Sequence, residues 1–178
     1  MKNKPVLIAL LFLTVFIMSC EKNDIEKLEY VPGEILFSPY DFISFQRTYR
    51  LIDSLNLTIK DLYNYRYDLI TTEDSVELIK TILSSKDYLT RQGNTYSVTY
   101  IDFIIKTTIN FFDLDINDAN DWFDTVESIN LTENLTESSN KWGLLEVPEG
   151  NEQFWVDELM QYEIIQSASL NHIVELRE

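Results

Sequence analysis

Five oxygen-bearing side chains in the second half of the chain have the spacing of a calcium-binding loop. Asp113, Asp115, Asn117, Asp121 and Asp124 fall at positions 1, 3, 5, 9 and 12 of that pattern. Carboxylate and amide oxygens at alternate residues can wrap a hard cation such as Ca²⁺. The spacing therefore raises the hypothesis of a calcium site.

The N-terminus of a helix is the alternative interpretation of the same segment. Asp118 stands where a calcium loop requires Gly for its sharp turn, and Asp124 stands where a longer Glu should chelate the ion. Asn117 or Asp118 could instead cap a helix, with acidic residues in the first turn complementing the helix dipole. We favour the helix, and expect the polypeptide to bind no metal and no other cofactor.

Residues suited to covalent or acid–base catalysis are scarce. His172 is the only histidine, and no Gly-x-Ser-x-Gly turn is present to expose a nucleophile. The sequence also lacks a phosphate-binding loop and a dinucleotide-binding fingerprint. The 30 carboxylates allow accidental pairs, but none of those pairs stands out. We expect no catalytic residues, and a protein that is not an enzyme.

The composition is that of an acidic globular protein. The chain has 178 residues, of which 45% are hydrophobic, and 14 basic residues stand against 30 acidic ones, a net charge of -16. This length is sufficient to bury a core in one domain. A strongly negative domain repels a phosphate backbone, so nucleic acid is not expected as a partner.

The first residues have the pattern of an export signal. Lys2 and Lys4 precede an uncharged, mostly apolar run over residues 5–18. The run is shorter than the ~20 residues that a helix needs to span a bilayer. Residues 1–19 are therefore predicted to form a signal peptide that is removed, rather than a membrane-spanning anchor.

The run ends in Ile17-Met18-Ser19-Cys20, which resembles the lipobox of bacterial lipoproteins. The resemblance implies cleavage between Ser19 and Cys20, a diacylglycerol thioether on Cys20, and an N-acyl group such as palmitate. Two or more acyl chains give stable anchoring, so the protein would contact a membrane through its lipid. The only non-protein groups expected are these covalent ones.

Residues 20–30 read as the lipidated cysteine followed by a short tether. Glu21, Lys22 and Asp24 resemble the charged export tag of lipoproteins from the Bacteroidetes, while a solvated linker is the alternative. We expect a lipid-anchored protein of the cell envelope, in the outer membrane. Whether it faces the periplasm or the cell surface stays open.

The remaining residues, 31–178, are predicted to form a globular α+β domain around a mainly antiparallel sheet. A division into two small subdomains, about 31–94 and 95–178, stays open as an alternative. The segment 95–112 fits either a strand or a helix, and we choose strand because Val, Ile, Thr, Tyr and Phe dominate it. The predicted elements are strand 34–37, helix 41–55, strand 63–69, helix 72–85, a turn at 92–94, strand 95–112, a helix from 117 or 118 to 129, loop 134–141, strand 142–147, helix 151–162 and strand 164–170.

Two parts of the domain resemble subtilisin-type propeptides and the related peptidase inhibitors. Residues 31–37 look like the start of such a domain, and residues 145–171 look like its closing half. The resemblance implies ferredoxin-like strand–helix–strand units. It also implies that residues 172–178 form a tail that enters a protease cleft.

Three tyrosines supply a candidate binding surface. Tyr63, Tyr65 and Tyr67 alternate with polar residues, which would place them on one face of a strand. Aromatic rings there could form a platform for a glycan or a peptide, although a row of this kind is more often part of the core. Our first hypothesis is an anchored, non-catalytic binding module for an envelope or extracellular protein or glycan. The alternative is a standalone propeptide-like inhibitor or folding helper of a subtilisin-type protease.

Overall fold

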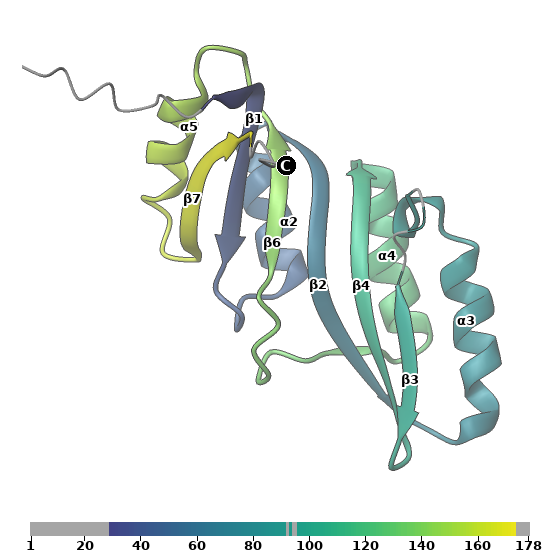
Figure 1. The fold of residues 1–178 in the computed structure, drawn as a ribbon. Helices are drawn as coiled ribbons and strands as arrows, with labels where there is room; N and C mark the ends of the chain where they lie inside the picture. The colour runs from purple at the N-terminus through teal and green to yellow at the C-terminus, as the bar shows by residue number, and fades with distance from the viewer. Residues whose placement is uncertain (1–28, 92, 94–95, 174–178) are drawn as a thin grey trace, which may run out of the picture.

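The computed structural model of the chain describes residues 29–91, 93 and 96–173 (Figure 1). The predicted signal peptide, Cys20 and nearly all of the tether lie outside these residues. Two positions of the predicted turn, Gln92 and Asn94, and the last part of the predicted tail, 174–178, lie outside them as well.

The described residues form an α+β fold with one sheet, as predicted. The sheet has the strand order β3-β4-β2-β6-β1-β7, with β5 beside β2, and its paired strands are antiparallel. The strands are β1 (Tyr30–Pro39), β2 (Thr58–Ile70), β3 (Ser97–Ile101), β4 (Ile104–Leu114), β5 (Thr132–Glu133), β6 (Trp142–Glu146) and β7 (Ile165–His172). The α-helices are α2 (Phe45–Ser54), α3 (Val76–Ser84), α4 (Ile116–Ser128) and α5 (Glu152–Leu159), with short 3₁₀ turns at Glu73–Ser75 and Asp87–Leu89.

Two strand–helix–strand connections are interleaved in this sheet. Helix α2 joins β1 to β2, and α5 joins β6 to β7. Strand β6 lies between β1 and β2, so strands from both sides of the boundary at 94–95 alternate across the sheet. The segment between β2 and β6 adds β4 and β3 beyond β2, together with α3 and α4 (Figure 1).

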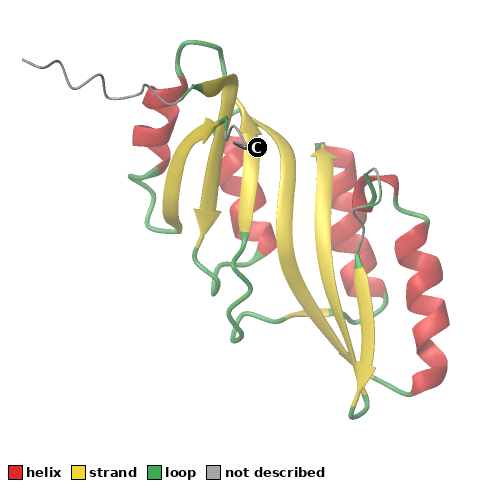
Figure 2. Ribbon diagram, in the orientation of Figure 1, coloured by secondary structure: helices red, strands yellow, loops and turns green. Residues whose placement is uncertain are grey.

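The core lies between the sheet and its helices. Figure 2 shows α2 and α4 behind the strands, whereas none of the described helices lies in front of β2, β4 and β6. Alternate strand residues turn one apolar face towards these helices, as the period of a strand requires. The largest fully buried aromatic side chains are Trp122, Tyr65, Phe37, Phe45 and Phe111.

The predicted strand 95–112, whose first residue lies outside the described residues, is extended over 97–101 and 104–112, as chosen, but these parts form a hairpin rather than one strand. Strands β3 and β4 pair with each other, with Ile101 opposite Ile104. Asp102 and Phe103 between them have φ values of 50° and 64°. Two successive left-handed residues make the tight turn that joins twisted antiparallel strands. The usual Asn-Gly or Asp-Gly signal for this turn is missing, which explains why the sequence did not reveal it.

Helix α4 begins one or two residues earlier than predicted, and its cap is Asp115 rather than Asn117 or Asp118. The Asp115 carboxylate accepts the backbone N–H groups of Asn117 (2.7 Å) and Asp118 (2.9 Å). The Asp118 carboxylate accepts the N–H of Asp115 in return, at 3.3 Å, which completes a reciprocal capping box. The prediction of a helix N-terminus in this segment is confirmed, and only its first residue is corrected.

Replacing Asp115 by Ala is expected to lower the melting temperature at neutral pH by a few degrees. The hydrogen bonds from Asp118 and Asn117 lower the pKa of Asp115. A lowered carboxylate pKa stabilises the fold above the unfolded-state pKa and loses this effect as pH falls through the folded-state pKa. Thermal melts of D115A and the parent protein should therefore differ at pH 7 and converge in acid. An equal difference at pH 7 and pH 3 would contradict the charged cap.

Candidate functional site

The three tyrosines do not share one face of β2, so that part of the prediction is wrong. Asn64 has a φ of 68°, and the register of β2 against β4 shifts between Leu62 and Tyr65. Such a bulge inserts one residue and reverses the alternation of side chains. Tyr65 and Tyr67 lie in the core, 0% and 2% exposed, whereas Tyr63 lies on the opposite, open face of the sheet.

On the open face, Tyr63 belongs to an aromatic cluster. Its ring stacks on Trp142 of β6, with centroids 4.1 Å apart and planes at 12°, and meets the edge of Phe112. The Arg91 guanidinium lies 5.0 Å from the centre of the Phe112 ring. It is also paired with Asp61 at 2.5 Å, so its charge is already offset. This cluster fastens the segment before β3 to the sheet.

The side chains of the calcium-loop pattern have separate partners. Asp113 pairs with Arg91, Asp115 caps α4, and Asp121 accepts from Lys86 Nζ at 2.7 Å. In the described ranges, no group of three or more His, Cys, Asp or Glu side chains is arranged to hold a metal ion. The other two residues of the pattern are exposed: Asn117 and Asp124.

His172 lies at the end of the edge strand β7. It is exposed and pairs with Tyr30 of β1, and the next N–H, that of Ile173, donates to the Glu29 carbonyl at 2.8 Å. The first two residues of the predicted tail are therefore held against the start of the described chain.

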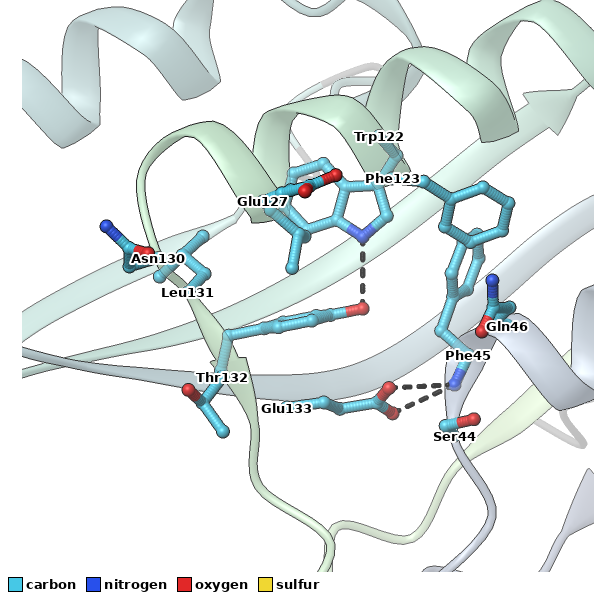
Figure 3. Close-up of a pocket in the computed structure, with 12 residues that line it drawn as sticks. Ser44, Phe45, Gln46, Trp122, Phe123, Glu127, Asn130, Leu131, Thr132 and Glu133 are labelled. Atoms are coloured by element: carbon cyan, nitrogen blue, oxygen red, sulfur yellow. Dashed lines mark hydrogen bonds between the residues drawn. The ribbon is translucent and has the colours of Figure 1, made fainter.

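A pocket of about 500 Å³ opens between the start of α2, the C-terminal half of α4 and strand β5 (Figure 3). Aromatic and aliphatic side chains form one part of its wall, and polar side chains form the other. Three stretches far apart in the sequence supply these residues. The lining residues are Ser44, Phe45, Gln46, Tyr67, Trp122, Phe123, Val126, Glu127, Asn130, Leu131, Thr132 and Glu133.

The Glu133 carboxylate positions α2 against β5. Its two oxygens lie 3.0 and 2.9 Å from the backbone nitrogen of Phe45, the first residue of the helix. Ser44 caps the same helix, and its hydroxyl accepts the N–H of Arg47 at 3.3 Å. A carboxylate at this place satisfies a free N–H and complements the positive end of the helix dipole.

A buried ammonium group lies behind Glu133. Lys141 Nζ donates to Glu133 Oε1 at 3.0 Å and to the carbonyl oxygens of Asp41 and Ile43 at 3.0 and 2.7 Å. The side chain of Lys141 is 0% exposed and that of Glu133 is 13% exposed. Burial raises the pKa of Glu133 more than the charge of Lys141 lowers it. The pair ties the loop before β6 to the loop before α2.

The back of the pocket is a pair of buried aromatic residues. Trp122 of α4 donates its indole N–H to the Tyr67 hydroxyl at 3.0 Å, and the two rings meet edge to face at 5.3 Å (Figure 3). This bond fixes α4 on β2 at the level of the pocket. Tyr67, predicted as part of a binding face, thus reaches the pocket wall from the core side of the sheet.

Replacing Tyr67 by Phe is expected to destabilise the protein by about 1 to 3 kcal/mol, because the buried N–H of Trp122 loses its acceptor. Tyr65 offers a matched control. Its buried hydroxyl has no partner with hydrogen-bond geometry in the described part of the chain. Y65F should therefore be neutral or slightly stabilising in urea unfolding. Equal losses in Y67F and Y65F would contradict the assignment.

The rim of the pocket is polar and carries no basic side chain. Gln46, Glu127, Asn130 and Thr132 are all exposed. The Glu127 carboxylate forms no ion pair within the described part of the chain. The sequence analysis did not find this site, because its residues come together only when β5 pairs with β2.

Comparisons of the chain with protein-family models, with curated proteins and with solved structures gave no match. None of the helices in the described ranges is both long and apolar enough to cross a membrane.

Proposed function

We propose that this protein is a lipid-anchored lipoprotein of the bacterial cell envelope whose folded part binds a ligand without catalysing a reaction. The lipobox-like Ile17-Met18-Ser19-Cys20 supports the anchor. The pocket between α2, α4 and β5 supports the binding role. Its volume of about 500 Å³ lies within the usual size of small-molecule sites, and its wall combines aromatic rings with convergent polar groups. The pocket is the observation that carries this function.

The anchor is tested by replacing Cys20 with Ser in the producing bacterium. The parent protein is expected in the membrane fraction, with a mass increased by the acyl groups. C20S is expected to keep its signal peptide and to lack that mass, because the thiol that accepts the lipid is gone. A parent protein without any lipid mass would contradict the proposal. Because C20S can stay at the membrane through its uncleaved apolar run, mass spectrometry is the deciding measurement.

The binding role is tested by filling the pocket. Thr132 is exposed on β5 and lines the pocket, and Thr99 is exposed on β3, away from it. A thermal-shift panel of saccharides, amines, carboxylates and short peptides should contain a class that stabilises the parent protein and T99W but not T132W. A panel without any stabilising class, or stabilisation that T132W retains, would contradict a binding role for this pocket.

The second proposed function is inhibition or folding assistance of a subtilisin-type protease. It is favoured by one observation, the strand order β7-β1-β6-β2 with α2 and α5 as the connecting helices. This is the order that two interleaved, ferredoxin-like strand–helix–strand units produce, with the segment between β2 and β6 as an addition. We expect the two proposed functions to be separable, because the inhibitor would act through its C-terminal tail.

The tail is tested with a chain that stops after Ile173, which keeps the pairing of Ile173 with Glu29. An inhibitor should slow a subtilisin-type protease at stoichiometric amounts, and the shortened chain should lose this inhibition. Rapid digestion of both chains would exclude the inhibitor function. A Glu127→Gln variant serves as the control, since a change in the pocket should leave protease inhibition unaltered.

A further inference from the structure

We infer that the pocket between α2, α4 and β5 binds a saccharide that is neutral or carries an amino group. The inference rests on the proposed binding function and names the class of ligand. Three features of the pocket support it: the mixture of donors and acceptors on its wall, the sign of its charge, and the aromatic rings beside the polar groups.

The polar groups of the wall match a ligand with many hydroxyl groups. They include hydroxyls, amides and carboxylates, and therefore both donors and acceptors. They come from three places in the fold, so they can contact a ligand from several sides (Figure 3). A sugar hydroxyl can donate and accept at once, and suits such a mixed wall better than a purely apolar or purely ionic ligand does. The polar side chains are Ser44, Gln46, Glu127, Asn130, Thr132 and Glu133.

The charge of the pocket excludes acidic sugars. The lining contains the carboxylates of Glu127 and Glu133 and no basic side chain. The Lys141 ammonium group does not line the pocket: it is buried behind Glu133 and donates to it and to two carbonyl oxygens. The whole chain has a net charge of -16. A uronic acid, a sulfate or a phosphate would therefore be repelled at this site.

The pocket is also poorly suited to a simple organic cation, because few of its carboxylate oxygens are free. Both oxygens of Glu133 already accept from the backbone N–H of Phe45, and one of them accepts from Lys141. Glu127 alone remains as a carboxylate without an ion-pair partner in the described part of the pocket wall. One exposed carboxylate gives a small cation little affinity in water. The same carboxylate can accept two hydroxyl hydrogen bonds from a sugar.

The aromatic rings supply the apolar part of the contact. Phe123 is half-buried and lines the pocket, and its ring centroid lies 5.6 Å from that of Phe45 (Figure 3). A pyranose has an apolar face of C–H groups that packs against such a ring, while its hydroxyls point to the polar side chains. A volume of about 500 Å³ is enough for one or two sugar rings.

The test uses the full chain, purified in a detergent without a sugar headgroup. Ligand-observed NMR and calorimetry are carried out with N-acetylglucosamine, glucosamine, maltose and cellobiose. Glucuronic acid and putrescine serve as the acidic-sugar and cation probes. At least one neutral or amino sugar should bind with a Kd between about 0.1 and 10 mM, in the range of weak small-ligand affinities, and glucuronic acid should not bind.

Variants locate the binding. E127Q and N130A should each raise the Kd for the sugar by about tenfold, which is the effect of one lost hydrogen bond in a binding site. Trp142→Ala removes the most exposed ring of the open-face cluster and should leave the affinity unchanged. Loss of sugar binding in W142A, with E127Q and N130A unaffected, would overturn the assignment to this pocket.

The two proposals fail differently. If only putrescine or only glucuronic acid bound, and T132W abolished that binding, the assignment of a neutral or amino sugar as the ligand would be wrong. The proposed binding function of the pocket would still stand. If none of the six probes bound, the assignment of a saccharide as the ligand would be wrong. If the broader thermal-shift panel also gave no stabilising class, the binding function would fail with it.

Discussion

Replacing Lys141 by Met is expected to reduce the free energy of unfolding by about 3 to 5 kcal/mol, the loss found when one partner of a buried ion pair is removed. The three donors of the ammonium group match its three acceptors, Glu133 and the carbonyls of Asp41 and Ile43. Met keeps the apolar stem but has no donor. Two carbonyl groups and one carboxylate, all buried or partly buried, would then lose a partner together, which gives the large effect.

The loss in K141M should depend on pH. Burial already raises the pKa of Glu133 above its usual value, and removing Lys141 removes a group that lowers it. A raised carboxylate pKa means that the folded state holds a proton more tightly than the unfolded state. Its stabilising contribution is present below the unfolded pKa of about 4.3 and is lost as pH rises through the folded value. In urea unfolding, the free energy of unfolding that K141M loses relative to the parent protein should therefore be smaller at pH 5 than at pH 8.

Two controls separate the buried pair from a general effect of removing a lysine. K80M removes an exposed partner of Glu77 and should change stability by less than about 1 kcal/mol. The double variant K141M/E133Q removes both charges, and its amide oxygen can still accept the N–H of Phe45. It should be more stable than K141M alone. Two results would contradict the role of the buried carboxylate: a loss of stability in K141M that does not change with pH, or a double variant that is no more stable than K141M.

The local pattern of the chain predicted most elements, because their apolar faces follow the helix and strand periods closely. Helix α2 buries four residues that follow one another at three-, one- and three-residue steps and so share one face of the helix: Phe45, Thr48, Tyr49 and Ile52. The α+β class followed from these elements. What the periods could not show is which strands become neighbours, since β6 inserts between β1 and β2 through pairing that spans about a hundred residues.

Departures from strict alternation explain the errors. The bulge at Asn64 separates Tyr63 from Tyr65 and Tyr67, and a sequence pattern with period two cannot register one extra residue. Asn at such a position is the only local signal, because Asn tolerates a positive φ. The three tyrosines therefore do not form the predicted binding face, and one of them, Tyr67, lines the pocket instead.

The pocket depends on contacts that are distant along the chain. Glu133 follows the end of α4, yet its carboxylate contacts Phe45, 88 residues away. Lys141 reaches the carbonyl of Ile43 across 98 residues. The sequence places these charged residues next to a polar loop, where solvated side chains are the usual expectation. The pairing of β5 with β2 places Glu133, and the pairing of β6 with β1 and β2 places the preceding Lys141, so the inward position of both charges depends on distant strands.

Replacing Gly143 by Ala is expected to destabilise the protein by about 3 kcal/mol, at the upper end of the range for overpacked cores. Gly143 lies in β6, between Phe37 of β1 and Leu62 of β2. An added Cβ would collide with the Phe37 ring, and it would lie 2.7 Å from Leu62 Cδ2 and 2.9 Å from the Asp61 carbonyl oxygen. The carbonyl belongs to the backbone of a central strand and cannot move aside easily.

The steric origin of this loss can be separated from glycine's conformational freedom. Gly150 has a φ of +85° and no atom within 4 Å of an added Cβ. G150A should therefore cost about 1 to 2 kcal/mol through backbone strain alone. Phe37→Leu shortens the colliding side chain, so F37L should be less harmful in the G143A background than in the parent protein, whereas in the G150A background the two losses should add. Urea unfolding of the two double-mutant cycles measures this coupling. Simple additivity of F37L with G143A would contradict the close approach of β1, β6 and β2 at Gly143.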